Sequence, residues 1–561
     1  MPAVKKGCPF ASGQRERKTM TLSSRPRKAT PAPCVEACPG GVDVPRYIRH
    51  IRKGEFDQAR AVVREQIPFS AVCGHVCVHP CESRCARIQY DETIAIRLLK
   101  RAAEENALVR REPVRPLATN KRVAIVGSGP SGLTAAYYLA RLGHQVVVFE
   151  ALPEPGGLLW YGIPSYRLPR EVILAEIDLI RSQGVEIITN KPIESPAGLL
   201  EDGFAAVLVA FGAWRTQKMG IDGENSTRVL SGLAFLREIN QGRRPALGRK
   251  VIVVGGGNTA LDAARAAVRL GAETRLLYRR RQEDMPAAAE EIIDALEEGV
   301  QMDFLTVPTG IADGKIACRK MTIGPPDASG RPLPIPLEGS EFPLEGDTLI
   351  MAVGQLVRGE GYGLDCHPDG TIKSDSANLA TSHPGVFAAG DAVTGPSTII
   401  QAIAQGKLAS RAIDMFLGGS GEIDFPAEDG PGGDLTDASA MGTGRRAVEK
   451  IPEAMRLGSF DLVECGYDGA AAIHEAARCL SCDLRSYEVT VNAVLCKECG
   501  YCREMCSLDI FETSDAFNPG GYKPSLARRP ERCVGCLKCL YVCPDFAITI
   551  TEGTRASRPQ G

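Results

Sequence analysis

The chain has 561 residues, 44% of them hydrophobic and 24% charged, and its formal net charge is −2. This length exceeds what one hydrophobic core supports, so three or more domains are expected, in a composition typical of soluble globular proteins. The near-zero net charge argues against nucleic-acid or membrane-surface binding, and no apolar run reaches transmembrane length. Because the N-terminus also lacks the apolar core of a secretory signal, we expect a cytoplasmic protein.

The 20 cysteines are the unusual part of the composition. Most of them gather in two groups, one before residue 86 and one after residue 464. In a chain without a secretion signal, tight cysteine groups predict iron–sulfur or metal ligands rather than disulfides. Zinc is the alternative for a four-cysteine set considered by itself, but the flavin motif described below favours electron carriers.

The N-terminal region has two expected parts. Residues 1–30 are rich in lysine and arginine, which predicts a disordered lead-in or, alternatively, a targeting or docking arm. Residues 31–118 are expected to form a helical iron–sulfur domain, because a stretch with apolar residues at helical spacing separates two cysteine groups. The cysteines of this domain are Cys34, Cys38, Cys73, Cys77, Cys81 and Cys85.

A dinucleotide-binding pattern occupies residues 121–150, KRVAIVGSGPSGLTAAYYLARLGHQVVVFE. An apolar strand leads into three glycines, a helical stretch follows, and a second apolar strand ends on an acid. The glycines permit a tight turn, close approach of the pyrophosphate and close helix–strand packing, while the helix N-terminus offers free N–H groups to phosphates. The terminal acid can accept hydrogen bonds from a ribose. The residues concerned are Gly127, Gly129, Gly132 and Glu150, with Pro130 and Ser131 opening the helix.

A second dinucleotide pattern begins at residue 251, VIVVGGGNTALDAARAAVRLGAETRLLYRRR. Its following strand ends on Arg279, Arg280 and Arg281 instead of an acid. An acid there favours NAD through the ribose 2′-hydroxyl, whereas arginines can pair with a 2′-phosphate, so NADPH is preferred over NADH. The alternative is that these arginines form a solvated turn. The glycine-loop residues expected to bind NADPH are Gly255, Gly257, Asn258, Thr259 and Ala260.

The order of the motifs predicts the rest of the architecture. A dinucleotide motif, a nested second motif and a return segment form the plan of flavoproteins with two dinucleotide domains, so the first motif should bind FAD. We expect an FAD domain in residues 119–245 and 346–417 that encloses an NADPH domain in 246–345. Residues 418–486 begin rich in glycine, proline and aspartate and are expected to be a linker, which carries Cys479-x-x-Cys482.

Residues 487–561 are predicted to form a bacterial-type ferredoxin domain with two [4Fe–4S] clusters. Two runs of the form Cys-x2-Cys-x2-Cys-x3-Cys are present, and in this type of run the fourth cysteine ligates the other cluster. The expected ligand sets are Cys496, Cys499, Cys502 and Cys543 for one cluster, and Cys533, Cys536, Cys539 and Cys506 for the other.

Two further segments carry a family resemblance. The segment GGLLWYGIPSYRLP after the first motif, together with the earlier CGHVC and PCESRC, resembles the glutamate synthase small-subunit family. That family includes the NADPH-handling half of dihydropyrimidine dehydrogenase and several NAD(P)H:ferredoxin oxidoreductases. The resemblance, which runs from about Cys34 to Phe416, implies an α/β core of two dinucleotide-binding domains and a phosphate role for Arg279 and Arg280. It also implies that Gly157, Leu158, Gly390, Asp391 and Thr398 contribute to the FAD site.

The chain departs from this family in its N-terminal cysteines. The family opens with a CxxC that forms a cluster with the equivalents of Cys34 and Cys85, and here only Cys8 precedes them. Because ARCLSCD reads like the missing segment, we hypothesise that Cys479 and Cys482 complete that cluster. The family's other cluster uses the equivalents of Cys38, Cys77 and Cys81 plus a glutamine or glutamate, whose place falls near Lys100. A protonated lysine is a poor ligand. Three possibilities therefore remain: Cys73 is the fourth ligand, another group is, or this cluster is absent.

These motifs predict an electron-transfer enzyme. NADPH delivers a two-electron hydride and iron–sulfur clusters take single electrons, so a flavin must lie between them. We expect an oxidoreductase subunit of a hetero-oligomer that exchanges electrons with a ferredoxin or a partner redox enzyme. The alternatives are a glutamate synthase small subunit, a disulfide reductase, and a wiring subunit with a vestigial nucleotide site. The disulfide reductase is disfavoured because residues 246–345 contain only Cys318 and therefore no redox CxxC.

Overall fold

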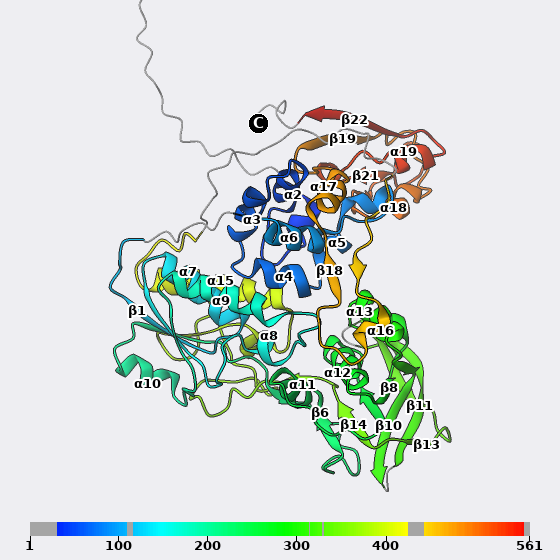
Figure 1. Cartoon of the computed structure of the whole chain (residues 1–561). Helices are drawn as coiled ribbons and strands as arrows, with labels where there is room; N and C mark the ends of the chain where they lie inside the picture. Colours follow the sequence, from blue (N-terminus) through cyan, green and yellow to red (C-terminus); the bar gives the residue numbers. More distant parts are fainter. Residues whose placement is uncertain (1–30, 109–115, 313–314, 328–329, 424–442, 555–561) are drawn as a thin grey trace, which may run out of the picture.

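The computed structural model describes residues 31–108, 116–312, 315–327, 330–423 and 443–554. The basic segment 1–30 and most of the glycine- and proline-rich run after residue 418 lie outside these ranges. Figure 1 shows the N-terminal helices between the first sheet, at left, and the C-terminal module, at upper right. The second sheet lies at lower right. Within the described ranges, no helix is both long and apolar enough to cross a membrane.

The N-terminal domain is a cluster of short helices around a buried core. In α2 (Val44–Arg52), Tyr47, Ile48 and Ile51 recur at helical spacing and are at most 1% exposed. Its N-cap is Asp43, whose carboxylate accepts a hydrogen bond from the Arg46 N–H at 3.3 Å. The other elements are α1 (Pro33–Glu36), α3 (Phe56–Arg64), α4 (Ser70–Val76), α5 (Pro80–Ser83), η1 (Ala86–Gln89) and α6 (Ile96–Glu105).

The first sheet is parallel, with strand order β16-β4-β1-β2-β3. Its central strands are buried aliphatic runs because helices cover the sheet. Strand β16 comes much later in the chain than the others, so the chain leaves this sheet and returns to it, as the motif order predicts. The strands are β1 (Arg122–Val126), β2 (Gln145–Phe149), β3 (Glu186–Ile188), β4 (Ala206–Val209) and β16 (Val386–Ala388). The helices are α7 (Pro130–Arg141), α8 (Leu158–Tyr161), α9 (Arg170–Ser182), α10 (Pro196–Glu201), α14 (Asp391–Thr394) and α15 (Ile399–Phe416).

The second sheet is also parallel, with strand order β6-β14-β7-β8-β9. It extends past the expected range 246–345 on both sides, because β6 and β14 belong to it. Strand β6 has only three residues, too few to show a strand pattern in the sequence. The strands are β6 (Val229–Ser231), β7 (Lys250–Val254), β8 (Glu273–Tyr278), β9 (Gln301–Phe304) and β14 (Thr348–Met351). The helices are α11 (Gly232–Asn240), α12 (Asn258–Arg269), η2 (Gln282–Asp284) and α13 (Ala289–Glu297).

Two antiparallel pieces accompany these parallel sheets. Strands β10 (Thr306–Ala312), β11 (Lys315–Pro326), β12 (Pro332–Pro336) and β13 (Phe342–Glu345) form a separate sheet that precedes β14 in the chain. Strands β5 (Arg215–Thr216) and β15 (Gln355–Leu356) pair where the chain crosses between the two parallel sheets.

The segment after residue 443 corrects the expectation of a linker over 418–486. It contains β17 (Glu449–Lys450), α16 (Glu453–Arg456), β18 (Glu464–Gly466) and α17 (Gly469–Ala477), and α17 packs on α2 and α6. The glycine- and proline-rich composition ends before these elements begin. They are short and are held by tertiary contacts, which hydrophobic periodicity does not reveal.

The C-terminal module is an α+β unit built on two antiparallel strand pairs. Strand β19 (Arg485–Val491) pairs with β22 (Ile548–Thr554), with Val489 opposite Ile550. Strand β20 (Phe511–Thr513) pairs with β21 (Ser525–Ala527). Three short helical elements complete it: α18 (Tyr501–Met505), η4 (Pro530–Arg532) and α19 (Lys538–Val542).

Candidate functional site

One cavity of about 1620 Å³ runs between the two parallel sheets and is lined by residues of both dinucleotide motifs. Its walls include Gly129 and Glu150 from the first motif and Asn258 and Thr259 from the second. Residues of both motifs therefore face one shared space. The cavity is also large enough for both nucleotides.

The first glycine loop is shaped for a pyrophosphate. A Cβ on Gly132 would lie 2.1 Å from the Gly127 carbonyl oxygen, so only glycine lets α7 pack this close to β1. Gly129 is the N-cap of α7, and a Cβ there would meet nothing within 4 Å, so the loop is open on the side of the ligand. The Ser131 hydroxyl is buried and has no hydrogen-bond partner among the described residues, which suits a donor for a phosphate oxygen. These features fit FAD.

Glu150 is held rigidly at the end of β2. Its carboxylate accepts hydrogen bonds from the Ser128 N–H at 3.0 Å, the Leu152 N–H at 2.8 Å and the Ser128 hydroxyl. The residue is 6% exposed and still lines the cavity. It is therefore placed to accept a hydrogen bond from a ribose hydroxyl.

The opposite wall comes from the return segment. Asp391 accepts hydrogen bonds from the Ser397 N–H at 3.1 Å and the Ser397 hydroxyl at 2.7 Å, and burial raises the pKa of this carboxyl. Thr398 and Gln401 form a capping box at the start of α15. The positive N-terminal end of α15 therefore faces the cavity, where it would stabilise negative charge on a bound group.

The structure places most of the expected FAD residues in the cavity wall. The lining residues are Gly127, Gly129, Pro130, Ser131, Glu150, Gly157, Leu158, Asp391 and Thr398. Gly132 and Gly390 lie behind the wall, where each allows close packing against a neighbouring segment. In the second motif Asn258 and Thr259 line the cavity, whereas Gly255, Gly257 and Ala260 are outside its wall.

The two expected phosphate-binding arginines differ in their surroundings. Arg279 is exposed. Arg280 is 4% exposed, and its guanidinium donates to the Pro332 carbonyl at 2.6 Å and to the Asp327 carboxylate at 3.0 Å. The Arg280 guanidinium is therefore already hydrogen-bonded to the antiparallel sheet of β10–β13. Arg279 is the better placed of the two for a 2′-phosphate. Arg331, which belongs to neither sequence motif, donates to the Tyr278 hydroxyl at 3.0 Å beside these arginines.

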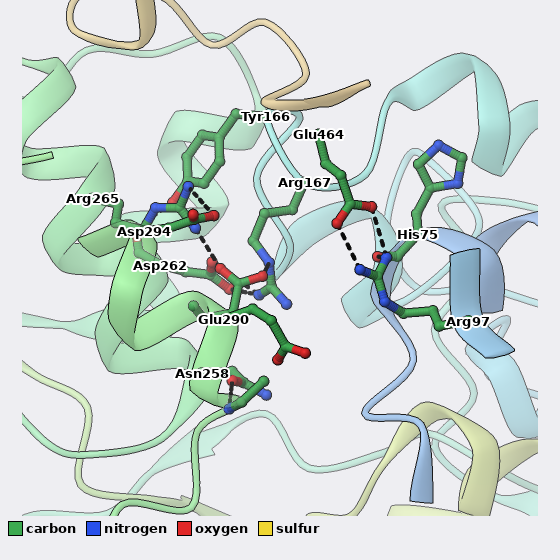
Figure 2. A network of polar contacts seen from close by, with 12 residues as sticks. His75, Arg97, Tyr166, Arg167, Asn258, Asp262, Arg265, Glu290, Asp294 and Glu464 are labelled. Carbon is green, nitrogen blue, oxygen red and sulfur yellow. Dashed lines mark hydrogen bonds and ion pairs between the residues drawn. The ribbon is translucent and has the colours of Figure 1, made fainter. Parts of the chain in front are cut away.

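A polar network fixes the second sheet against the first domain (Figure 2). Arg167, from the RLP segment, donates to both carboxylate oxygens of Asp262 at 3.0 and 2.8 Å, and both residues line the cavity. The Tyr166 hydroxyl donates to the Asp262 carbonyl at 3.0 Å, and the Arg265 guanidinium lies 4.9 Å from the Tyr166 ring centre. In the same view Arg97 of α6 pairs with both carboxylate oxygens of Glu464, at 2.8 and 2.6 Å. The domains are thus joined by buried charge pairs.

Set A is the group of N-terminal cysteines next to the cavity: Cys38, Cys73, Cys77 and Cys81. Lys100, 3% exposed, lies among them. Burial alone would lower the pKa of Lys100, but the sulfurs of Cys77, Cys73, Cys81 and Cys38 raise it overall. The structure therefore puts the buried Lys100 side chain where the family has a glutamine or glutamate, and brings Cys73 into the set as a fourth sulfur.

Set B consists of Cys34, Cys85, Cys479 and Cys482, which together line one small hollow. The pKa of Cys34 is raised by burial and then by the sulfurs of Cys482, Cys85 and Cys479. The CxxC reaches this place because α17 is anchored on the helical domain. Glu475, fully buried, accepts from the Ala95 N–H at 3.0 Å, and Arg87 donates to the Arg478 carbonyl at 2.9 Å.

The C-terminal module holds two sets with the crossed arrangement. Set C is Cys506, Cys533, Cys536 and Cys539; burial and the sulfurs of Cys536, Cys533 and Cys506 raise the pKa of Cys539 to about 12. Set D is Cys496, Cys499, Cys502 and Cys543, which line another hollow. In each set the fourth cysteine comes from the other run, as the spacing predicts.

The four sets follow one another from the cavity to the surface. Val76 and Val78, on either side of Cys77, line the dinucleotide cavity. Tyr47 lies between sets A and B, since burial and then Cys81 and Cys34 raise the pKa of its hydroxyl.

Sets B and C are neighbours as well. Cys482 packs against the hydrophobic cores of both domains. Gln89, four residues after Cys85, has its side-chain oxygen 3.9 Å from the Cys536 sulfur. Set D is in the same module as set C, and its Cys499 is exposed.

These thiol sets suit a group larger than one ion. Among the described residues, no three or more His, Cys, Asp or Glu side chains are arranged to hold a single metal ion. Four thiols grouped together are the ligand type that iron–sulfur clusters use. Two nested dinucleotide-binding sheets joined to cysteine-rich domains at both ends define an iron–sulfur flavoprotein oxidoreductase.

Comparisons with known proteins agree. The family models "Pyridine nucleotide-disulphide oxidoreductase", "Dihydropyrimidine dehydrogenase domain II, 4Fe-4S cluster" and "4Fe-4S dicluster domain" match residues 121–406, 5–111 and 495–547. The chain belongs to the pyridine nucleotide-disulphide oxidoreductase family, in the group that contains the glutamate synthase small chains.

Three relatives illustrate this group. The "NADP(+)-dependent formate dehydrogenase subunit beta" of Moorella thermoacetica is 40% identical over 499 residues, covering 80% of this chain and 70% of that protein. The "NADPH-Fe(3+) oxidoreductase subunit beta" of Geobacter sulfurreducens is 37% identical over 520 residues, covering 82% and 76%. The "Glutamate synthase [NADPH] small chain" of Escherichia coli is 32% identical over 420 residues, covering 68% and 88%.

The expected family, fold class and cofactors are therefore confirmed. The chain is an NAD(P)H oxidoreductase that uses FAD and [4Fe–4S] clusters, with an N-terminal iron–sulfur domain and a C-terminal ferredoxin domain on a two-dinucleotide-domain core.

Proposed function

We propose that the chain is the pyridine-nucleotide-handling subunit of a larger redox enzyme. It exchanges a hydride with NADPH and single electrons with a ferredoxin or a partner redox subunit, in either direction. Two relatives are named as beta subunits of NADP- or NADPH-linked enzymes, which supports a place in a hetero-oligomer.

The observation that carries this proposal is the unbroken series of cysteine sets from the cavity wall to the exposed Cys499. When bound, FAD converts between a hydride and single electrons, and iron–sulfur clusters carry single electrons. We propose sets A, B, C and D as the ligands of four clusters. Cys73 takes the place of the family's non-cysteine ligand in set A, and Cys479 and Cys482 replace its N-terminal CxxC in set B.

The nucleotide loop of the second motif sets the preference for NADPH. Asn258 accepts a hydrogen bond from the Ala288 N–H at 3.1 Å, which fixes the loop at the start of α12. The exposed Arg279 then supplies a guanidinium at the end of β8 for the 2′-phosphate.

Anaerobic mixing of the purified protein with NADPH in a stopped-flow spectrometer tests the function. We expect the flavin absorbance to bleach and the iron–sulfur absorbance to fall within the same turnover. A flavin that stays oxidised would mean that the chain only carries electrons between partners and does not oxidise NADPH.

A matched pair of variants tests the nucleotide preference. Arg279→Ala should raise the KM for NADPH about tenfold or more and leave the KM for NADH unchanged, because a lost charged pair to a phosphate costs about 1.5–3 kcal/mol. Arg280→Ala should lower thermal stability through the lost contact with Asp327, with little effect on either KM. Equal effects of Arg279→Ala on both nucleotides would contradict the assignment.

A further inference from the structure

Large apolar side chains are concentrated on the surface around set D. Of the twenty-one large hydrophobic residues that are exposed in the described ranges, eight lie between residues 494 and 546. Five of them belong to three loops that surround the set D hollow, and we call these five the distal rim. They are Val494 (67% exposed), Leu495 (46%), Phe517 (68%), Tyr522 (41%) and Phe546 (84%).

Hydrogen bonds hold the three loops of the distal rim together. The Asn518 side-chain amide donates to the carbonyls of Ala493 and Cys496, both at 2.8 Å, which ties the loop of Phe517 to that of Val494. The Lys497 N–H donates to the Asp545 carboxylate at 3.3 Å, which ties the loop of Phe546 to the same place. The rim is therefore one built surface next to the exposed Cys499 rather than a set of scattered side chains.

This surface carries charges of both signs and contains one ion pair between its loops. The Lys497 ammonium pairs with Asp545 at 3.2 Å, and the Glu498 carboxylate accepts from the Lys523 N–H at 2.9 Å. The Lys523 ammonium lies 5.4 Å from the centre of the Phe517 ring. The surface therefore offers a partner apolar and aromatic contact area with little net charge.

The apolar surface of the distal rim, which has little net charge, distinguishes between two kinds of electron-transfer partner. A freely exchanging small redox protein forms a small interface and is steered to it by opposite charge. A permanently bound subunit buries an apolar interface with aromatic anchors, and large exposed apolar patches usually mark such contacts. The distal rim resembles the interface of a permanently bound subunit.

We propose that the distal rim is the docking site of a permanently bound partner subunit, which covers set D with a neutral apolar surface and carries its own one-electron redox centre near that surface. This proposal rests on the proposed function, because the partner's redox centre would exchange electrons with a cluster in set D. Two relatives are named as beta subunits, which supports the presence of a partner subunit.

The full-length tagged chain, purified anaerobically from its own cells, tests the docking site. The wild type should retain one redox-centre-bearing subunit at fixed stoichiometry through a wash with 0.5 M sodium chloride, and NADPH should reduce that centre. Phe517→Ser/Phe546→Ser should lose the subunit at least tenfold, while its own iron content and flavin bleaching stay unchanged.

The matched control is Leu333→Ser/Leu337→Ser, which removes two exposed apolar residues, 45% and 49% exposed, at the far antiparallel sheet. It should retain the subunit. The proposal is overturned if the wild type holds no such subunit, releases it in salt, or uses the rim only to self-associate, or if the phenylalanine variant still holds it. Flavin bleaching is scored separately, so failure of the proposed function shows as a flavin that NADPH does not reduce.

Discussion

The two iron–sulfur regions of this chain hold their cysteines in opposite ways. In the C-terminal module all eight cysteines of sets C and D come from residues 496–543, and their spacing alone indicates which belong together. In the N-terminal domain, set B joins residues 34 and 85 to residues 479 and 482, across the whole flavoprotein core. A site built from one local motif can form and fail with its own module, whereas a site built from both ends depends on the global fold.

The environments of the sets differ in the same sense. Set A encloses the buried Lys100, and set B is covered by α17 with its buried Glu475 and Arg478. Set D reaches the surface at Cys499 and is surrounded by exposed apolar side chains. Under the proposed function, the N-terminal sets are interior relays and set D is the outlet.

The largest effect that this comparison predicts is that of Cys479→Ala/Cys482→Ala. We expect a loss of about four irons per chain and a first unfolding transition lowered by about 5–10 °C, since losing the cross-link should cost about 2–3 kcal/mol. Iron analysis and calorimetry measure both quantities. Cys465→Ala, an exposed cysteine of the same segment, is the control and should change neither. Unchanged iron in the double variant would remove Cys479 and Cys482 from set B.

Cys496→Ala/Cys499→Ala gives the contrasting result in the C-terminal module. The loss should again be about four irons, but the unfolding transition of the flavoprotein core should move by less than about 2 °C because set D does not connect distant segments. NADPH should still bleach the flavin, and reduction of an external acceptor should stop. A large fall in the stability of the flavoprotein core would show that the module is not independent.

The contrast also explains what could be predicted from the sequence. The first glycine loop and sets C and D are local patterns, so their residues could be assigned before the structure was known. The CxxC at Cys479 could be connected to Cys34 only through its likeness to a displaced family segment. No local pattern shows that Arg280 pairs with Asp327, because Asp327 follows β11 and lies 47 residues further along the chain.

Secondary structure shows the same contrast between elements set by local sequence and elements set by distant contacts. The long parallel strands and α7, α12 and α15 follow from apolar runs and glycine loops. The three-residue β6 and the elements between residues 449 and 477 could not be predicted, because they are held by neighbours and not by their own pattern.

A smaller effect is expected from Lys100→Met, which removes the buried charge of set A and keeps the volume of the side chain. A positive charge among the ligands stabilises the reduced and more negative state of a cluster. Removing it should therefore lower the reduction potential of a cluster in set A by about 60–120 mV. For one electron, about 59 mV corresponds to a tenfold change in the equilibrium constant of reduction. A redox titration followed by electron paramagnetic resonance measures this potential. Lys53→Met, at the exposed end of α2, should leave all potentials unchanged. A loss of iron in Lys100→Met would instead mean that Lys100 is needed to hold the cluster.

The smallest effect concerns Glu176, where α9 meets the N-terminal domain. Burial raises the pKa of this carboxyl, partly offset by Arg64, and Glu104, which shares Arg64, raises it further. The folded chain therefore keeps a proton that the unfolded chain has released above its ordinary pKa of about 4.3. Stability from this group is present at low pH and is lost as pH rises toward the raised value.

Between pH 6 and pH 9 the wild-type core should therefore lose more stability than Glu176→Gln. Calorimetry at the two pH values provides the comparison. Residues 487–551 of the C-terminal module, whose side chains the structure describes, include no buried carboxylate, so transitions of that module should not show this dependence in either protein. Equal slopes for both proteins in the core transition would mean that Glu176 is charged in the folded state and that Arg64 neutralises both carboxylates.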